Sequence, residues 1–438
     1  MLSAQRPSRR LTHECEGYDE QKNKIKLKSG ASIGEPAAED DHAFLADCFV
    51  NHPIVDAMKE VSSPQCVLLG RTGAGKSAIM WHLEDTLENV SRLDPREMAF
   101  QYLGNSAIIQ QIAELGVNLH TLYEYLWTHT LTLHICRECL GANTQQGLNG
   151  IVDKIKGVIW RDQKRETAVK YLEKHANNFW LDVENISSEI TKSISEKLAT
   201  EAGLSPEVLK VKMEAGWNWK EEQKRAFRYR AQEVVSSLQI RELKETINAL
   251  AYCIESKKSY YIIIDDLDTD LCGNEETQYA LMRALIESLK TFRRVPRVKI
   301  IVAMREDLYE ATLRTTTDKH FQAEKLEGII KRIRWTDNLL LNLIDRRIQQ
   351  LFRHSYTTQV VGLSEVMATE VARSTTSTYL LNRTLRRPRD IIAFINKILT
   401  QTKVRIFHYP PARLRKWNPF IRLIDCAHSR MSGDPAIR

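Results

Sequence analysis

The sequence predicts an α/β protein with a parallel sheet at its core and a large helical insertion. Three short apolar runs support this prediction, because each ends in glycine or polar residues as a buried parallel strand does at its carboxyl end. The runs cover residues 66–69, 260–264 and 298–304. Amphipathic patterns with helical spacing follow these runs or separate them, which is the order expected of a sheet covered by helices.

The first run leads into a glycine-rich segment with the G-x-x-x-x-G-K-[ST] spacing of a phosphate-binding loop. Its residues are Gly70, Arg71, Thr72, Gly73, Ala74, Gly75, Lys76 and Ser77. A helical pattern begins directly after the segment, so strand, loop and helix follow one another as the motif requires. A chance glycine-rich turn is the alternative, and the flanking strand and helix disfavour it.

This loop has a chemistry that suits a nucleoside triphosphate. Glycines let backbone N–H groups approach a phosphate closely, and the N-terminus of the following helix favours negative charge. Lys76 is expected to reach the β- and γ-phosphates, and Ser77 to hold Mg²⁺. No guanine-reading N-K-x-D sequence follows, so ATP is the expected nucleotide, although GTP stays open.

The second run ends in carboxylates that are expected to serve the same ligand. Asp265 and Asp266 come directly after residues 260–264, and ligands of parallel sheets bind at the carboxyl edge of the strands. We expect Asp265 to bind Mg²⁺ directly or through water, and Asp266 to polarise the attacking water. A buried strand that runs into an acidic turn is the simpler interpretation, and the phosphate loop disfavours it.

Two arginines are candidates for contacts with the phosphates. Arg305 follows the third run and would lie beside the γ-phosphate if this strand neighbours the loop strand, or it pairs with Glu306 or Asp307. Arg389 lies at the predicted start of a later helix and could face the phosphates from a lid. Alternatively, it belongs to a solvated basic cluster with its arginine neighbours.

The chain divides into four parts by composition and periodicity. Residues 1–30 are polar and are expected to be disordered, and residues 31–335 form the predicted nucleotide-binding core. Within this core a further strand is expected at 98–103, and about residues 106–256 are mostly helical. Residues 336–402 are again helical, and residues 403–438 form a basic tail. The helical insertion is either a packed subdomain or a surface for a partner or a second copy.

Composition limits the class of protein. The 438 residues are 43% hydrophobic and 27% charged, as in an ordinary soluble globular protein. No apolar run reaches the ~20 residues that span a bilayer, and the N-terminus has no apolar signal segment, so a cytoplasmic location and no membrane contact are expected. Cys136 and Cys139 form a C-x-x-C sequence, which is a candidate zinc pair, although a buried helix explains both cysteines without a metal.

The net charge of +7 is concentrated at the C-terminus. Residues 403–438 contain eight Lys and Arg against two Asp. This excess favours either contact with nucleic acid or a solvated end of the chain with little regular structure.

Together the motifs resemble bacterial P-loop ATPases related to the KAP and STAND groups, which are often met in prokaryotic genome-defence loci. The resemblance covers about residues 33–403. It depends on segments 34–39, 70–77, 126–129, 264–268, 303–307, 333–335 and 387–390.

The resemblance implies a five-stranded parallel core with a C-terminal helical lid, similar to the AAA+ plan. It also implies that Lys76, Ser77, Asp265 and Asp266 act on the nucleotide, that Arg305 ends a sensor strand, and that Arg389 is a lid arginine. Beyond Lys403 the chain departs from the family pattern and becomes rich in proline and arginine.

The resulting expectation is an ATP-hydrolysing molecular switch in a defence or genome-maintenance complex. The alternatives are a nucleotide-gated scaffold with negligible turnover and a DNA-acting motor or loader that uses the basic tail. A homo-oligomer or an effector protein is a candidate partner. In an oligomer, Arg332 or Arg334 would be the arginine donated to a neighbouring copy, unless they pair with nearby acids such as Glu327 and Asp337.

Overall fold

The computed structural model describes most of the chain outside the termini and the middle of the predicted insertion. The described residues are 24–26, 28, 30–95, 107–140, 258–267, 274–314, 324–367, 369–401, 406–408 and shorter stretches between 192 and 257. The strand expected at 98–103 and nearly all of the basic tail lie outside this part.

The chain forms two compact units, which we treat separately. The sheet unit comprises Ala37–Leu339 and Arg387–Arg389, and the C-terminal unit comprises Met1–Pro36, Leu340–Arg386 and Asp390–Arg438.

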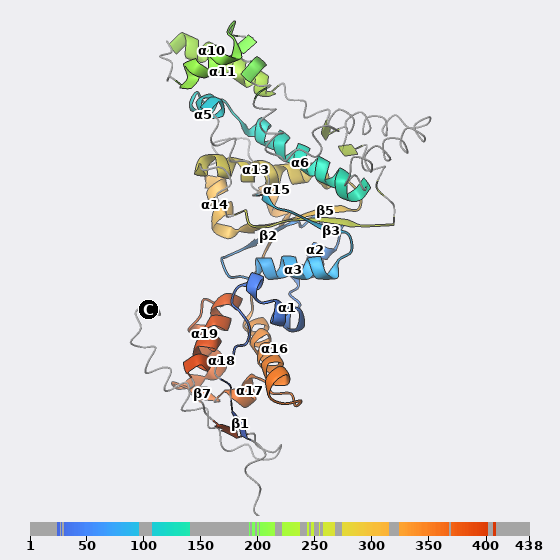
Figure 1. Ribbon diagram of the computed structural model, residues 1–438, viewed down its shortest axis with the longest axis vertical. Helices are drawn as coiled ribbons and strands as arrows, with labels where there is room; N and C mark the ends of the chain where they lie inside the picture. The colour runs from blue at the N-terminus through green and yellow to red at the C-terminus, as the bar shows by residue number, and fades with distance from the viewer. Residues whose placement is uncertain are drawn as a thin grey trace, which may run out of the picture. The chain divides into compact units, whose positions relative to one another are not determined.

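A five-stranded parallel sheet forms the centre of the sheet unit, with the strand order β3-β4-β5-β2-β6 (Figure 1). The mixed α/β class with a parallel sheet is therefore confirmed. The three central strands coincide with the three apolar runs of the sequence, whereas the two edge strands were not predicted. The strands are β2 (Val67–Gly70), β3 (Val90–Leu93), β4 (Tyr260–Ile264), β5 (Val298–Arg305) and β6 (Ile330–Arg332).

The register of the sheet brings the candidate site residues to one edge. In β2 and β5, Gly70 is opposite Arg305, and in β4 and β5, Ile264 is opposite Val302. Because all five strands are parallel, the segments that follow them leave the sheet at the same side. Arg305 was expected beside the γ-phosphate only if its strand neighbours the loop strand. β5 and β2 are indeed neighbours.

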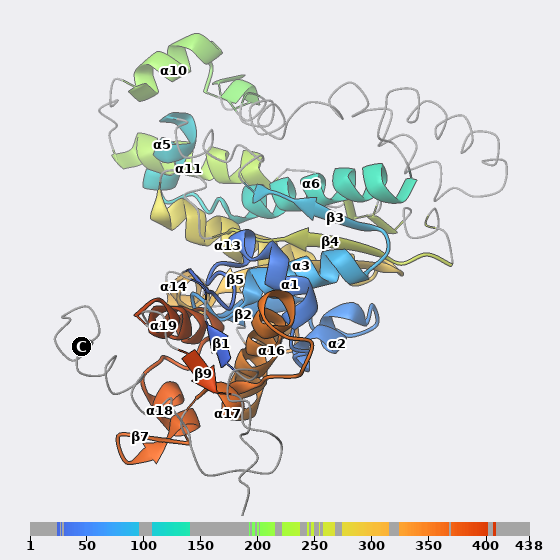
Figure 2. The same cartoon turned by 60° about the horizontal axis from the view of Figure 1, so that its bottom comes forward.

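Alternating side chains of the strands build two separate cores. Leu69, Ile262 and Val302 face a core that includes α6 (His120–Leu140) and α13 (Glu275–Phe292). Leu68, Ile263 and Ala303 face the opposite core, with α2 (Ile54–Lys59) and α3 (Lys76–Thr86). This alternation follows from the two-residue period of a strand, and it places helices on both faces of the sheet (Figure 2).

The long helix α6 belongs to the core of the sheet unit although it lies in the range expected to be an insertion. It packs along α13, and the buried indole N–H of Trp127 donates to the carbonyl of Leu281 at 2.9 Å. The other described helices of this range are α5 (Ala107–Glu114), which precedes α6, and α10 (Pro206–Glu214) and α11 (Glu221–Ser236), which follow it. The other helices of this unit are η1 (Ala38–Asp40), α1 (His42–Cys48), α14 (Glu306–Arg314) and α15 (Glu324–Glu327).

The C-terminal unit is built from helices that enclose an N-terminal segment of the chain. The guanidinium of the buried Arg347 donates to the carbonyl of Ile33 at 2.9 Å, and the amide of Asn396 donates to the carbonyl of Gly34 at 2.7 Å. The elements are α16 (Asp337–Ser355), α17 (Leu363–Val366), α18 (Thr376–Asn382), α19 (Pro388–Gln401), β7 (Glu370–Val371) and β8 (Ser374–Thr375). Two short strands also pair here, β1 (Lys24–Lys26) with β9 (Ile406–His408), although disorder was expected for residues 1–30.

A buried lysine ties helix α2 to the sheet at the edge opposite the phosphate loop. Lys299 of β5 is 4% exposed. Its ammonium donates to three backbone carbonyls: that of Ala57 at 2.7 Å, that of Ser63 at 3.4 Å, and that of Glu60 through a short contact. Burial lowers the pKa of Lys299 to about 8. The amine is therefore held by three backbone acceptors in a place that disfavours its charge.

We expect the stability of the protein to depend on the titration of this lysine. Between pH 8 and 10 the unfolded chain binds more protons at Lys299 than the folded chain, so the free energy of unfolding should rise with pH. Urea unfolding at several pH values should show a steeper rise in the native chain than in Lys299→Met. Lys331→Met, a change at an exposed residue of β6, is the control. Equal slopes in all three proteins would mean that the carbonyls keep the ammonium charged throughout this range.

Candidate functional site

The glycine-rich segment Gly70–Ser77 joins β2 to α3, as its motif predicts. Gly73 and Gly75 have φ values of +75° and +89°, a left-handed backbone that side chains disfavour and that explains glycine at both positions. Lys76 and Ser77 are the first two residues of α3. The N–H groups of a first helical turn have no acceptor within the helix, so this end of α3 suits an anion.

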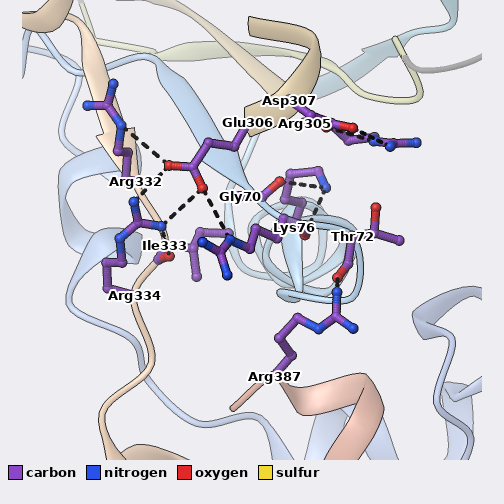
Figure 3. A network of polar contacts seen from close by, with 11 residues as sticks. Gly70, Thr72, Lys76, Arg305, Glu306, Asp307, Arg332, Ile333, Arg334 and Arg387 are labelled. Atoms are coloured by element: carbon purple, nitrogen blue, oxygen red, sulfur yellow. Dashed lines mark hydrogen bonds and ion pairs between the residues drawn. The ribbon is translucent and has the colours of Figure 1, made fainter. Parts of the chain in front are cut away.

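The Lys76 side chain lies over its own loop. Its ammonium donates to the carbonyls of Gly70 at 3.3 Å and Arg71 at 3.5 Å (Figure 3). Both contacts are long for a charged donor. They hold the ammonium beside the loop at weak acceptors that a phosphate oxygen can replace.

Asp265 is a buried carboxylate with an unused acceptor. It is 5% exposed, and its Oδ2 has no hydrogen-bond partner among the described residues. Burial raises the pKa of Asp265, against the hydrogen bond from the backbone of Asp266, which lowers it. The charge of Asp266 also raises this pKa, whereas the charges of Arg92 and Lys76 lower it. An orphaned carboxylate oxygen fits a hard cation such as Mg²⁺, which takes oxygen ligands. Asp265 and the hydroxyl of Ser77 are the residues that would hold it.

The neighbouring Asp266 has a left-handed backbone. Its φ is +59°, in a region that Asp occupies more readily than most residues because its short polar side chain can hydrogen-bond locally. Five other described residues with side chains also have a positive φ, so this conformation does not by itself mark a functional site. Asp268 lies outside the described residues.

Arg92 is a cation of this edge that was not predicted. It lies on β3, and its Nε donates to Glu84 of α3 at 2.7 Å, with the guanidinium 6.0 Å from the centre of the Trp81 ring. Its charge lowers the pKa of Asp265. Because β3 is a short strand of half-buried residues, no apolar run in the sequence signals it.

Arg305 pairs with Asp307, which is one of the two alternatives that the sequence left open. Its Nε donates to Asp307 Oδ1 at 3.0 Å, and this contact lowers the pKa of Asp307. In Figure 3 the paired side chains lie away from Lys76. The contact with Asp307 engages Nε and one terminal nitrogen of the guanidinium.

The two candidate trans arginines are also held by carboxylates. Arg332 donates to both oxygens of Glu327, at 2.6 Å and 2.9 Å, which is a pairing that the sequence suggested. Arg334 donates to both oxygens of Glu306, at 2.7 Å and 3.2 Å. The importance of Glu306 was not predicted, because its partners are far away in the sequence.

Segment Arg387–Arg389 covers the outer side of the loop and belongs to the same compact unit. The Arg387 guanidinium donates to the carbonyl of Thr72 at 2.8 Å, and the backbone N–H of Arg389 donates to that of Gly73 at 3.3 Å. The predicted lid arginine, Arg389, thus donates to the loop through its backbone and packs side-chain carbons beside Gly73, while the guanidinium hydrogen bond comes from Arg387 (Figure 3).

Trp335, which lies three residues after the end of β6, contacts the loop. Its indole N–H donates to the carbonyl of Ala74 at 2.8 Å, and its ring would lie 3.8 Å from a Cβ placed on Gly75. The supporting contacts of Trp335 and Arg387–Arg389 are made to loop carbonyls and occupy none of the loop N–H groups, of which that of Ala74 donates to the carbonyl of Arg71 at 3.1 Å.

Comparison with known proteins relates only the C-terminal helices to a family. Residues 338–406 match the family model of the FunZ-associated C-terminal helical domain, and FunZ is a defence-associated family. No P-loop or KAP family model matches. No curated protein and no solved structure matches the chain.

Two further findings concern metals and membranes. Among the described residues no group of three or more His, Cys, Asp or Glu is placed to hold a metal ion. Cys136 and Cys139 lie on α6, but their side chains are outside the described part, so the zinc prediction stays untested. No helix in the described ranges combines the length and apolarity needed to cross a membrane.

We expect a side chain at Gly73 to destabilise the fold, because segment Arg387–Arg389 contacts the loop there. A Cβ on Gly73 would lie 2.8 Å from the Cβ of Arg389, whereas one on Gly203, which also has a positive φ of +66°, would meet nothing within 4 Å. Both substitutions by alanine carry the left-handed backbone cost of roughly 1–2 kcal/mol. Gly73→Ala should therefore lower the free energy of urea unfolding by more than Gly203→Ala. Equal losses would show that Arg389 moves aside without cost.

Proposed function

We propose that this protein binds Mg²⁺-ATP at the carboxyl edge of its sheet and hydrolyses it as a molecular switch. The observation that carries the proposal is the pairing of a glycine-rich loop, held in its left-handed conformation at Gly73 and Gly75, with the buried and partly unsatisfied Asp265 at the same edge. A phosphate chain needs donors on one side and charge compensation on the other, and these residues offer both.

In this proposal each site residue has a separate role in hydrolysis. The loop N–H groups and Lys76 would bind the β- and γ-phosphates, with the ammonium leaving the carbonyls of Gly70 and Arg71. Ser77 and Asp265 would hold Mg²⁺, which would supply neutralisation of the phosphate charge. Asp266 would orient a water molecule and accept its proton as the water oxygen bonds to the γ-phosphorus and the bond to the bridging oxygen breaks.

A nucleotide-gated scaffold with negligible turnover is the second candidate. It is favoured by the pairing of Arg305, Arg332 and Arg334 with carboxylates, because each of these cations would have to leave its carboxylate partner before it could stabilise a transition state. Under this alternative a second copy of the chain or an effector protein would be needed to start hydrolysis.

The biological setting is part of the proposal. The match of residues 338–406 to a FunZ-associated domain supports a role in prokaryotic defence, in line with the resemblance of the motifs. The DNA-acting alternative depends on the basic tail beyond residue 408, which lies outside the described part. A cytoplasmic location remains the expectation from the sequence.

We expect Lys76→Ala to weaken the binding of a fluorescent ATP analogue by at least about tenfold, the scale of one lost hydrogen bond to a charged group. Lys290→Ala, a change at an exposed residue of α13, is the matched control. Circular dichroism should show that both variants are folded. Unchanged affinity in Lys76→Ala would exclude the loop as the phosphate site.

We expect Asp266→Asn to bind ATP and to lose hydrolysis by about two orders of magnitude or more, the scale of a lost general base. The measurement is phosphate release at saturating ATP and Mg²⁺, next to a direct binding titration. Absence of turnover in the native chain would favour the scaffold, and equal loss of binding and turnover in the variant would indicate a structural carboxylate.

A further inference from the structure

One carboxylate next to the phosphate loop is surrounded by three arginines. Glu306 is the first residue of α14 and directly follows β5, and its side chain is 14% exposed. Arg334 binds it through two nitrogens, at 2.7 Å and 3.2 Å. The Nε atoms of Arg332 and Arg71 lie 3.7 Å and 3.9 Å from it.

The three arginines differ in how firmly they are held. Arg332 has a second carboxylate, Glu327, which accepts two of its hydrogen bonds. The side chain of Arg71 is 74% exposed, and its ion pair among the described residues is the long contact to Glu306. The side chain of Arg334 is 61% exposed. Arg71 and Arg334 therefore have most of their surfaces open to another anion.

The charges of the cluster are not balanced. Three guanidiniums face two carboxylates, Glu306 and Glu327, so one positive charge is left over. The cluster also adjoins the loop, because Arg71 is its second residue. The same three arginines lower the pKa of Glu306, with the hydrogen bond from Arg334 as the largest cause.

We infer that Glu306 is a positioning residue that occupies Arg71 and Arg334 in the nucleotide-free protein and releases them to the terminal phosphate of a triphosphate. The inference deepens the proposed function and rests on it. A nucleoside diphosphate lacks the terminal phosphate and leaves both arginines on Glu306. The cluster thereby distinguishes triphosphate from diphosphate at the loop.

A positioning role of Glu306 predicts different effects on the affinities for ATP and ADP, whereas a purely structural role does not. Removing the competing carboxylate in Glu306→Gln should tighten the binding of a non-hydrolysable ATP analogue by up to roughly fivefold, the scale of a partly exposed ion pair. The affinity for ADP should not change. If Glu306 only stabilises the fold, its loss weakens both nucleotides equally or changes neither.

The chain provides a matched control on the same helix. Glu310 pairs with Arg314 at 3.0 Å, so Glu310→Gln also removes a carboxylate from an arginine, one helical turn after Glu306 and outside the ion pairs of the cluster. We expect this variant to bind both nucleotides as the native chain does. Tighter ATP binding in both variants would indicate a general effect of net charge and would overturn the inference.

A second variant keeps the inference testable if Glu306→Gln does not fold. Arg71→Gln removes the exposed arginine and should weaken the ATP analogue several-fold while leaving ADP unchanged. Equal effects on ATP and ADP would overturn the inference. If neither nucleotide binds even to the native chain, the proposed function fails, an outcome distinct from nucleotide binding that does not respond to Glu306 or Arg71.

Discussion

The position of β5 between β4 and β2 is the constraint on which the candidate site depends. Its parallel pairing sets Gly70 opposite Arg305 and Ile264 opposite Val302, so the loop, the two aspartates and the arginine leave the sheet at one edge. The pairing is stable because β5 is buried along nearly its whole length and contributes side chains to both cores. Because β4, β5 and β2 are parallel and in this register, the phosphate loop and Asp265 emerge at the same edge, one strand apart.

The polar groups around this edge are mostly satisfied by internal contacts. Lys76 rests on loop carbonyls, Arg305 on Asp307, and Arg334 on Glu306. Asp265 differs from these cations, because one of its oxygens is buried without a donor among the described residues. A phosphate ligand at this edge would therefore have to compete with these internal carbonyl and carboxylate acceptors for Lys76, Arg305 and Arg334.

The sequence was sufficient to predict the central strands of the sheet and the position of the glycine-rich loop between β2 and α3. Apolar runs identify β2, β4 and β5 because these strands are buried on both faces, and the spacing of the glycines identifies the loop. The edge strands β3 and β6 escape prediction because they are short and half exposed. Arg92 was therefore missed with its strand.

Contacts between distant segments could not be predicted at all. Glu306 meets Arg334 and Arg71, and Trp335 meets the loop, only because the sheet brings their strands together. In the C-terminal unit, Arg347 binds the carbonyl of Ile33 across most of the length of the chain. No local pattern of residues carries information of this kind, since pairing partners are chosen by the fold.

The most direct test of the account is amide hydrogen exchange of the full chain with and without Mg²⁺ and a non-hydrolysable ATP analogue. The account predicts slower exchange in peptides that cover Gly70–Ser77, with a smaller effect at the end of β4, because bound phosphate takes up the loop N–H groups. Peptides from the middle of α13, on the far side of the sheet from α3, should not change. Saturating nucleotide that leaves exchange in Gly70–Ser77 unaltered would contradict the central claim.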